Sequence, residues 1–135
     1  MNILMVASDN DRASGAFLSM VRLTEILRNE FGHNVYIVVS RDGNGELLLN
    51  ERNIPYFNIR AYNWIIKLSE VNNVIKNLEM EIKFLLNNIS IYKLKKLINE
   101  LDIDVVHINT SWTYVGAIAA KKCGIPANLF QLVCL

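Results

Sequence analysis

The chain has 135 residues, a length typical of one domain. Hydrophobic residues make up 52% and charged residues 20%, so the composition excludes a disordered chain. With a formal net charge of +1, the sequence has no general attraction to nucleic acid, and we expect no nucleic-acid partner. The two cysteines, Cys123 and Cys134, are too few for a disulfide framework, which favours a reducing compartment.

The sequence shows no targeting or membrane-spanning segment. Residues 3–7 are apolar, but a polar loop follows them at once, and no apolar run approaches the roughly 20 residues that a spanning helix needs. We therefore expect a cytoplasmic protein. Lysines outnumber glutamates in residues 64–101, which leaves open either a solvated helix face or contact with a membrane surface.

The first third of the chain alternates strands and helices. Residues 3–7 form a continuous apolar run that is typical of a strand buried on both faces. Ser14 suits the N-cap of a following helix, and Gly32 suits its end. Residues 35–39 are rich in β-branched side chains and predict a second strand.

A short helix over residues 46–52 and a third strand over residues 56–59 continue this alternation. Residues 64–101 then have helical periodicity, and we expect a break into two helices at Asn87, Asn88 and Ser90, because these residue types favour turns and caps.

A fourth strand is predicted over residues 105–108, a helix over residues 114–123 ending at Gly124, and a fifth strand over residues 128–133. The alternation predicts one α/β domain over residues 1–135, a Rossmann-like parallel sheet with helices on both faces.

Two polar loops are the strongest candidates for a binding site. Ligands of open parallel sheets bind outside the carboxyl ends of the strands, where the strand order reverses. If the first strand is central, residues 8–16 and residues 109–113 face the same crevice, and each loop ends at a helix N-terminus that suits a phosphate or carboxylate.

Ser14, Gly15 and Ala16 form the first candidate group, because glycine lets a ligand approach the backbone closely. The alternative is that these residues only begin a helix. His107 is the second candidate, as a donor to a sugar or phosphate or as an acid or base, and the alternative is a core histidine bonded to a carbonyl. Asn109, Thr110 and Ser111 add short donors and acceptors, a composition that turns also have.

Cofactor and metal signatures are absent from the sequence. There is no GxGxxG fingerprint and no P-loop, so we expect no nucleotide cofactor. The two histidines and two cysteines have no metal-ligand spacing, so we expect no metal.

An ordered set of segments resembles the N-terminal domain of family 4 glycosyltransferases of the GT-B fold. The segments are Met1 to Val6, Ser14-Gly15-Ala16, His33 to Val39, Asp104 to Asn109, and Ala120 to Pro126. The resemblance extends from residue 1 to about residue 127.

This resemblance implies the acceptor-binding half of a retaining, metal-independent enzyme that transfers a sugar from a nucleotide sugar to a glycan or a lipid-linked acceptor in polysaccharide biosynthesis. It implies that Gly15 lies near the donor phosphates and the acceptor, and that His107 and the loop of Asn109, Thr110 and Ser111 line the acceptor side. The nucleotide sugar would bind only with a donor domain.

The end of the sequence departs from the family. A histidine followed by an acidic residue commonly closes the family's strand after Gly-Ile-Pro, and residues 128–135 contain neither. We therefore expect a truncated gene product or a separately encoded half that is inactive alone. An apolar edge strand at this end would favour self-association.

Two other hypotheses remain open at this stage. One is a non-catalytic α/β module that pairs with another polypeptide. The other is a flavodoxin-like domain with a different small ligand.

Overall fold

The structure, a computed structural model, describes residues 1–63, 69, 72–109 and 113–129. The strands in the described residues are β1 (Asn2–Val6), β2 (Asn34–Val39), β3 (Tyr56–Asn58), β4 (Val105–Ile108) and β5 (Ala127–Leu129). The helices are α1 (Gly15–Asn29), α2 (Gly45–Glu51), α3 (Val74–Glu100) and α4 (Val115–Cys123). The predicted order of strands and helices is confirmed, with shifts of one or two residues at most element ends, except that one helix, α3, lies where two were expected.

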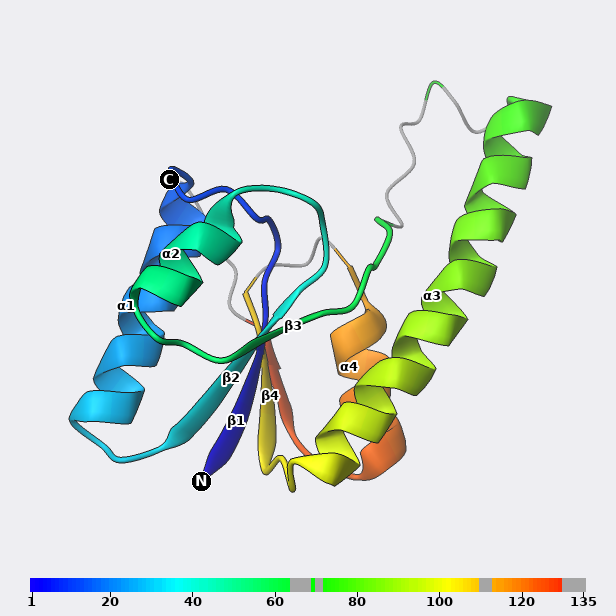
Figure 1. The fold of residues 1–135 in the computed structure, drawn as a ribbon. Coiled ribbons are helices and arrows are strands. Elements are labelled where there is room, and N and C mark those ends of the chain that lie inside the picture. Colours follow the sequence, from blue (N-terminus) through cyan, green and yellow to red (C-terminus); the bar gives the residue numbers. More distant parts are fainter. Residues whose placement is uncertain (64–68, 70–71, 110–112, 130–135) are drawn as a thin grey trace.

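All strand pairs are parallel, and the sheet order is β3-β2-β1-β4-β5 (Figure 1). Strand β1 is therefore central. After β3 the chain crosses from one side of β1 to the other, where β4 pairs with β1. Because the strand order reverses between β1 and β4, the predicted switch point lies between these two strands. The predicted Rossmann-like α/β fold is confirmed.

Each face of the sheet has its own hydrophobic core, because alternate residues of a strand point to opposite faces. Helices α1 and α2 cover one face, and α3 and α4 cover the other (Figure 1). The face under α1 and α2 buries Ile3, Met5, Val35, Ile37, Val39, Phe17, Met20 and Leu49. The face under α3 and α4 buries Leu4, Val6, Val38, Val106, Ile108, Leu94, Ile98 and Ala119. The continuous apolar runs of β1 and β2 are thus explained by burial on both faces.

The expected break near Asn87 is wrong, because α3 is one helix from Val74 to Glu100. Asn87 is buried, and its side chain bonds the backbone of Tyr62 twice: Oδ1 accepts from the Tyr62 N–H at 2.8 Å, and Nδ2 donates to the Tyr62 carbonyl at 3.0 Å. The Ser90 hydroxyl donates to the carbonyl oxygens of Arg60 and Leu86. These polar side chains hold the segment after β3 against the helix instead of ending it.

The last described elements follow the prediction closely. Gly124 ends α4 in the left-handed region with φ of 71°, which favours glycine. β5 begins at Ala127, and its three residues are exposed. The predicted strand continued to residue 133, but residues 130–135 lie outside the described part of the chain. Self-association through the β5 edge stays a prediction.

Candidate functional site

The loops that follow β1, β2 and β4 meet at the carboxyl edge of the sheet. Asn109, directly after β4, donates its backbone N–H to the carbonyl oxygen of Val6 at 3.1 Å, and Ala7 donates to the carbonyl of Val38 at 2.9 Å. The sheet therefore fixes where each of these loops starts.

Ser14 is the N-cap of α1, as predicted. Its Oγ accepts a 3.5 Å hydrogen bond from the Phe17 N–H and donates a 2.7 Å bond to Oδ2 of Asp9. Asp11 supports the same turn, since its carbonyl accepts from the Ser14 N–H at 3.0 Å. The Ser14 hydroxyl thus has a structural role, which is the alternative that the sequence left open.

Gly15 is exposed at the start of α1. Apart from the backbone of its own helix and its chain neighbours, no described heavy atom lies within 4 Å of the position that a Cβ would take, and the φ of Gly15 is not positive. Neither packing nor backbone conformation in the described chain therefore requires glycine here. The open space is what a ligand approaching the backbone needs.

Ala16 and Asn109, two of the predicted site residues, are brought into direct contact. The Nδ2 of Asn109 donates a 3.1 Å hydrogen bond to the Ala16 carbonyl, and the Asn109 side chain is buried. This bond joins the end of β4 to the first turn of α1 across the switch point. Thr110 and Ser111, predicted on the same loop, lie outside the described residues.

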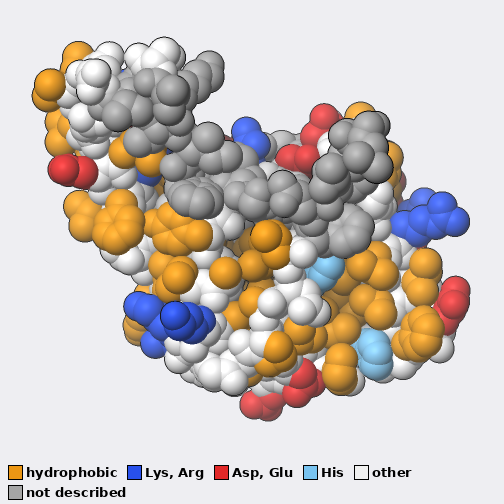
Figure 2. All heavy atoms as spheres, turned by 180° about the vertical axis from the view of Figure 1, so that it is seen from behind, with side chains coloured by type: hydrophobic (Ala, Val, Ile, Leu, Met, Phe, Trp, Pro, Cys, Tyr) orange, Lys and Arg blue, Asp and Glu red, His pale blue; other side chains and the backbone are white. Residues whose placement is uncertain are grey.

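His107 lies in β4 opposite Met5 of β1 and Asn128 of β5. Its neighbours in the strand, Val106 and Ile108, belong to the core under α3 and α4, so the His107 side chain points to the face that carries α1. Figure 2 shows both histidines of the protein on one face, among hydrophobic side chains. Partial burial lowers the pKa of His107, which favours the neutral imidazole near pH 7.

A charged group at the carboxyl ends of β2 and β3 was missed by sequence reasoning. Three hollows lined by described residues share Arg41 and Asp42, and two of these hollows include Arg60. Arg60 donates a 2.7 Å hydrogen bond to Asp42, and this contact raises the pKa of Arg60. The signal was available, because residues 41–45 also follow the carboxyl end of a strand, but the sequence pattern was interpreted only as a turn.

Several buried oxygen atoms lie at the same edge. Within the described residues, Oδ1 of Asp9, Oδ1 of Asn10 and Oγ of Ser40 are buried and have no hydrogen-bond partner. Buried polar atoms normally have one, so these atoms suit hydrogen bonds from a ligand or water. Asp9 and Asn10 line one of the hollows, and Ser40 lines the other two.

The described residues contain neither a metal-ligand cluster nor a helix that could span a membrane. No group of three or more His, Cys, Asp or Glu side chains there could hold a metal ion. No helix in the described part of the chain is both long and apolar enough to cross a membrane.

Solved structures with the same fold include several glycosyltransferases. The fold is similar to that of MurG from Acinetobacter baumannii (TM-score 0.65, 19% identity, 93% of this chain and 33% of that one). It is also similar to Anabaena Alr3699/HepE, solved with UDP and glucose (TM-score 0.60, 19% identity, 94% and 28%). A deacetylase of teicoplanin biosynthesis is similar too (TM-score 0.60, 12% identity, 96% and 66%), so the likeness shows the fold alone. This chain spans about a third of the length of MurG and of HepE.

The family assignment rests on a match between the sequence and a family model. No protein with a curated description matches the chain significantly. The family model described as "Glycosyl transferase 4-like" matches residues 18–130, which is most of the chain. The resemblance seen in the sequence motifs is confirmed, and the fold is that of a Rossmann-like domain of GT-B glycosyltransferases. The chain therefore belongs to the glycosyl transferase 4-like family.

Proposed function

We propose that the chain is the acceptor-binding lobe of a glycosyltransferase. The complete enzyme would transfer a sugar, with retention and without a metal, from a nucleotide sugar to a glycan or a lipid-linked acceptor in polysaccharide biosynthesis. The family match supports the reaction class, and the chain's coverage of about a third of its structural relatives supports the assignment of one lobe. The reaction would occur in the cytoplasm, and a lipid-linked acceptor would bring the lobe to a membrane surface.

The observation that carries this proposal is the polar carboxyl edge of the sheet. Buried oxygens of Asp9, Asn10 and Ser40 have no partner among the described residues, and they lie beside hollows that Arg41 and Arg60 line. Free acceptors and cationic donors side by side suit a hydroxyl-rich molecule, because each sugar hydroxyl both donates and accepts.

We assign roles within this lobe as follows. The open space at Gly15 would let the acceptor or the donor phosphates approach the start of α1, where Ser14 and Ala16 shape the turn. His107 would face the acceptor with a neutral ring that can donate one hydrogen bond and accept another. Asn109, Thr110 and Ser111 would complete this side. Anabaena HepE was solved with UDP and glucose, and we propose that a nucleotide sugar reaches this chain only when a donor lobe covers the edge.

Nuclear magnetic resonance with the ¹⁵N-labelled chain tests the proposal. We expect one or more members of a panel of bacterial oligosaccharides to shift the backbone amides of Gly15, Ala16 and Asn109. UDP-glucose added alone should leave those amides unchanged and should release no UDP. The amides of Arg28 and Asn29, in the last turn of α1 at the opposite edge of the sheet, serve as the internal control.

Two results would contradict the proposal. One is turnover of UDP-glucose by the isolated chain, because this lobe has no proposed donor site. The other is a complete lack of shifts at the carboxyl edge with every oligosaccharide tested. Shifts confined to other parts of the molecule would assign the binding to another surface.

A further inference from the structure

Helix α3 carries a second apolar face that covers nothing in the described chain. Six of its large side chains point away from the sheet and are between 50% and 77% exposed: Ile75, Leu78, Ile82, Leu85, Ile89 and Tyr92. We call these six residues the outer stripe. In Figure 1 the N-terminal half of α3 projects beyond the sheet, and in Figure 2 hydrophobic side chains gather along this projecting end at the upper left.

The spacing of the outer stripe is that of a coiled-coil seam. Its members are separated by alternating steps of three and four residues, so they occupy the a and d positions of a heptad. The a positions are all isoleucine (Ile75, Ile82 and Ile89), and the d positions are Leu78, Leu85 and Tyr92.

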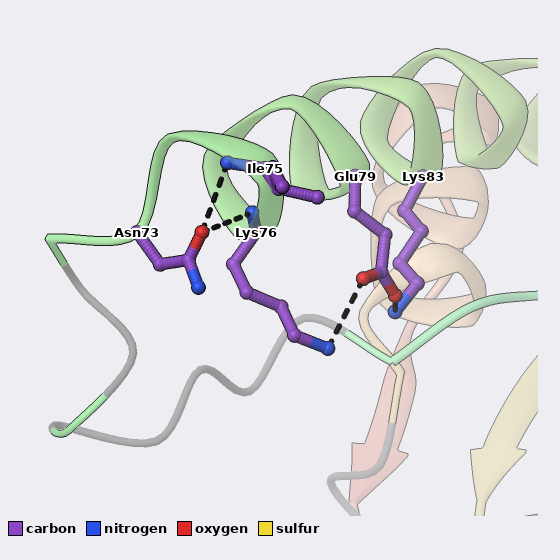
Figure 3. A network of polar contacts seen from close by, with 5 residues as sticks. All are labelled: Asn73, Ile75, Lys76, Glu79 and Lys83. Carbon is purple, nitrogen blue, oxygen red and sulfur yellow. Dashed lines mark hydrogen bonds and ion pairs between the residues drawn. The ribbon is translucent and has the colours of Figure 1, made fainter.

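The opposite side of α3 is already occupied. Its C-terminal half buries Ile91, Leu94 and Ile98 against the body of the protein. In its N-terminal half, Glu79 holds Lys83 at 2.6 Å and Lys76 at 3.3 Å, as Figure 3 shows. The ammonium groups of Lys76 and Lys83 are therefore engaged by Glu79 on the inner side of α3.

The charges on the projecting half of α3 argue against an anionic membrane as the partner of the outer stripe. A helix that binds such a membrane carries lysine or arginine along the borders of its apolar face. Lys76 and Lys83 are engaged by Glu79 on the inner side, and Glu81 is an exposed acidic residue on the projecting half. A protein surface with the same apolar pattern fits this half of the helix better than anionic lipid does.

We propose that the outer stripe is a dimerisation surface that pairs with the outer stripe of a second copy of this chain. The stripe extends about 26 Å along the helix at 1.5 Å per residue. Covering it on both copies would remove roughly 1,200 Å² of accessible surface from water, the lower end of the range for specific interfaces. None of the six residues lines the hollows at the carboxyl edge of the sheet, so the inference does not depend on the proposed function.

Charge selects the antiparallel orientation of the two helices. Lys96 occupies the a position one heptad after Ile89 and is 66% exposed. A parallel pair would place the two Lys96 side chains in the same layer, and like charges directly opposite each other are destabilising. An antiparallel pair separates the two lysines and brings Ile75 of one copy beside Tyr92 of the other. The helices then form the two-fold symmetric contact that is usual for homodimers.

Sedimentation velocity of the chain tests the proposal directly. We expect a reversible monomer–dimer equilibrium between about 1 and 100 µM, the range for a small apolar interface. Ile82→Glu places a charge at the centre of the seam and should weaken the dimer by at least about tenfold. Phe84→Glu is the matched control, because Phe84 is 57% exposed on the same helix but lies outside the outer stripe. Circular dichroism spectra and melting curves confirm that both variants remain folded.

Each outcome supports or overturns the inference. A chain that stays monomeric up to about 100 µM overturns it. It is also overturned if Phe84→Glu weakens the dimer as much as Ile82→Glu does, because the contact is then unspecific. Association that Ile82→Glu leaves unchanged overturns it and points to another surface, such as the β5 edge. Co-sedimentation of a monomeric chain with phosphatidylglycerol vesicles, lost in Ile82→Glu, would show that lipid occupies the stripe instead.

Cysteine cross-linking tests the orientation. In the antiparallel dimer, a mixture of Ile75→Cys and Tyr92→Cys chains should form an intermolecular disulfide under mild oxidation, and Ile75→Cys alone should not. Efficient cross-linking of Ile75→Cys with itself would contradict the antiparallel pair. The unsubstituted chain reports any background from its own cysteines.

Discussion

The side-chain amide of Asn109 donates a 3.1 Å hydrogen bond to the carbonyl oxygen of Ala16, 93 residues away in the sequence. Asn109 follows β4, and Ala16 lies in the first turn of α1, so this bond closes the switch point of the sheet. It also fixes the position of Gly15 relative to the β4 loop. The Asn109 side chain, which the sequence placed among ligand-binding candidates, therefore has a structural role: its hydrogen bond holds the two loops of the candidate site together.

Replacing Asn109 should destabilise the protein. Asn109→Ala removes this bond from a buried position, and we expect a loss of about 1–2 kcal/mol in the free energy of unfolding. Urea denaturation followed by circular dichroism measures the change. Asn128→Ala, on the exposed strand β5, is the control and should stay within about 0.5 kcal/mol of the parent. Equal stability of Asn109→Ala and the parent would show that the hydrogen bond to Ala16 contributes nothing to stability.

Alanine substitutions at the adjacent residues Asn87 and Asn88 should differ strongly in their effect on the free energy of unfolding. Asn87 is buried and bonds both the N–H and the carbonyl of Tyr62, so Asn87→Ala should cost about 2 kcal/mol. Asn88 is exposed on the same helix, and Asn88→Ala should be neutral or stabilising by up to about 0.5 kcal/mol, because alanine has the higher helix propensity. Thermal unfolding of the two variants measures the difference. Similar losses for both would contradict a specific role of the Tyr62 contacts.

This pair also shows how far the sequence predicts the fold. Apolar runs located β1, β2 and β4, and the alternation of elements predicted the parallel sheet, because these signals depend only on local pattern. The polar pair Asn87 and Asn88 was interpreted as a break by the same local logic. The bonds of Asn87 go to a residue 25 positions away, and no local pattern contains them.

The candidate site was predictable to a similar degree. The topology rule alone brought residues 14–16 and Asn109 to one edge, which the structure confirms. The Arg60–Asp42 contact was not predictable, because it needs the β2–β3 pairing and the path of the chain after β3. The outer stripe of α3 was visible as periodicity, but periodicity did not show which of two apolar faces the core would bury.

His107 should make stability depend on pH. Partial burial lowers its pKa in the folded state below the ordinary value of 6.5. As the pH falls through 6.5, the unfolded chain therefore takes up this proton before the folded chain does, and the protein loses stability. The loss stops once the pH is below the folded pKa, and above about pH 7 His107 contributes no pH dependence. Nuclear magnetic resonance titration of the imidazole protons measures the folded pKa directly.

The matched variant for this prediction is His107→Gln, which cannot titrate. Unfolding free energies of the parent and His107→Gln should run parallel above about pH 7, and the parent should lose more stability as the pH falls below 6.5. Parallel curves throughout, or a folded pKa above 6.5, would contradict burial as the dominant influence on His107.

Replacement by alanine should destabilise the protein at Gly43 but not at Gly15. A Cβ on Gly43 would lie 1.8 Å from the carbonyl oxygen of Asn10, which also accepts hydrogen bonds from the N–H groups of Asn44 and Gly45. The loops after β1 and β2 must then separate, so Gly43→Ala should cost about 2 kcal/mol or more. The methyl group of Gly15→Ala meets no described atom outside its own helix and chain neighbours, so the change should be neutral or stabilising by up to about 1 kcal/mol.

Ligand binding then separates the two roles of these glycines. Gly15→Ala should keep the fold yet weaken binding of any oligosaccharide that shifts the Gly15 amide, because its methyl group occupies the space proposed for the ligand. Titrations of the ¹⁵N-labelled variant measure the affinity, and melting curves measure the stability. Unchanged affinity in Gly15→Ala would place the ligand away from the start of α1. A large loss of stability would instead mean that Gly15 is needed for packing.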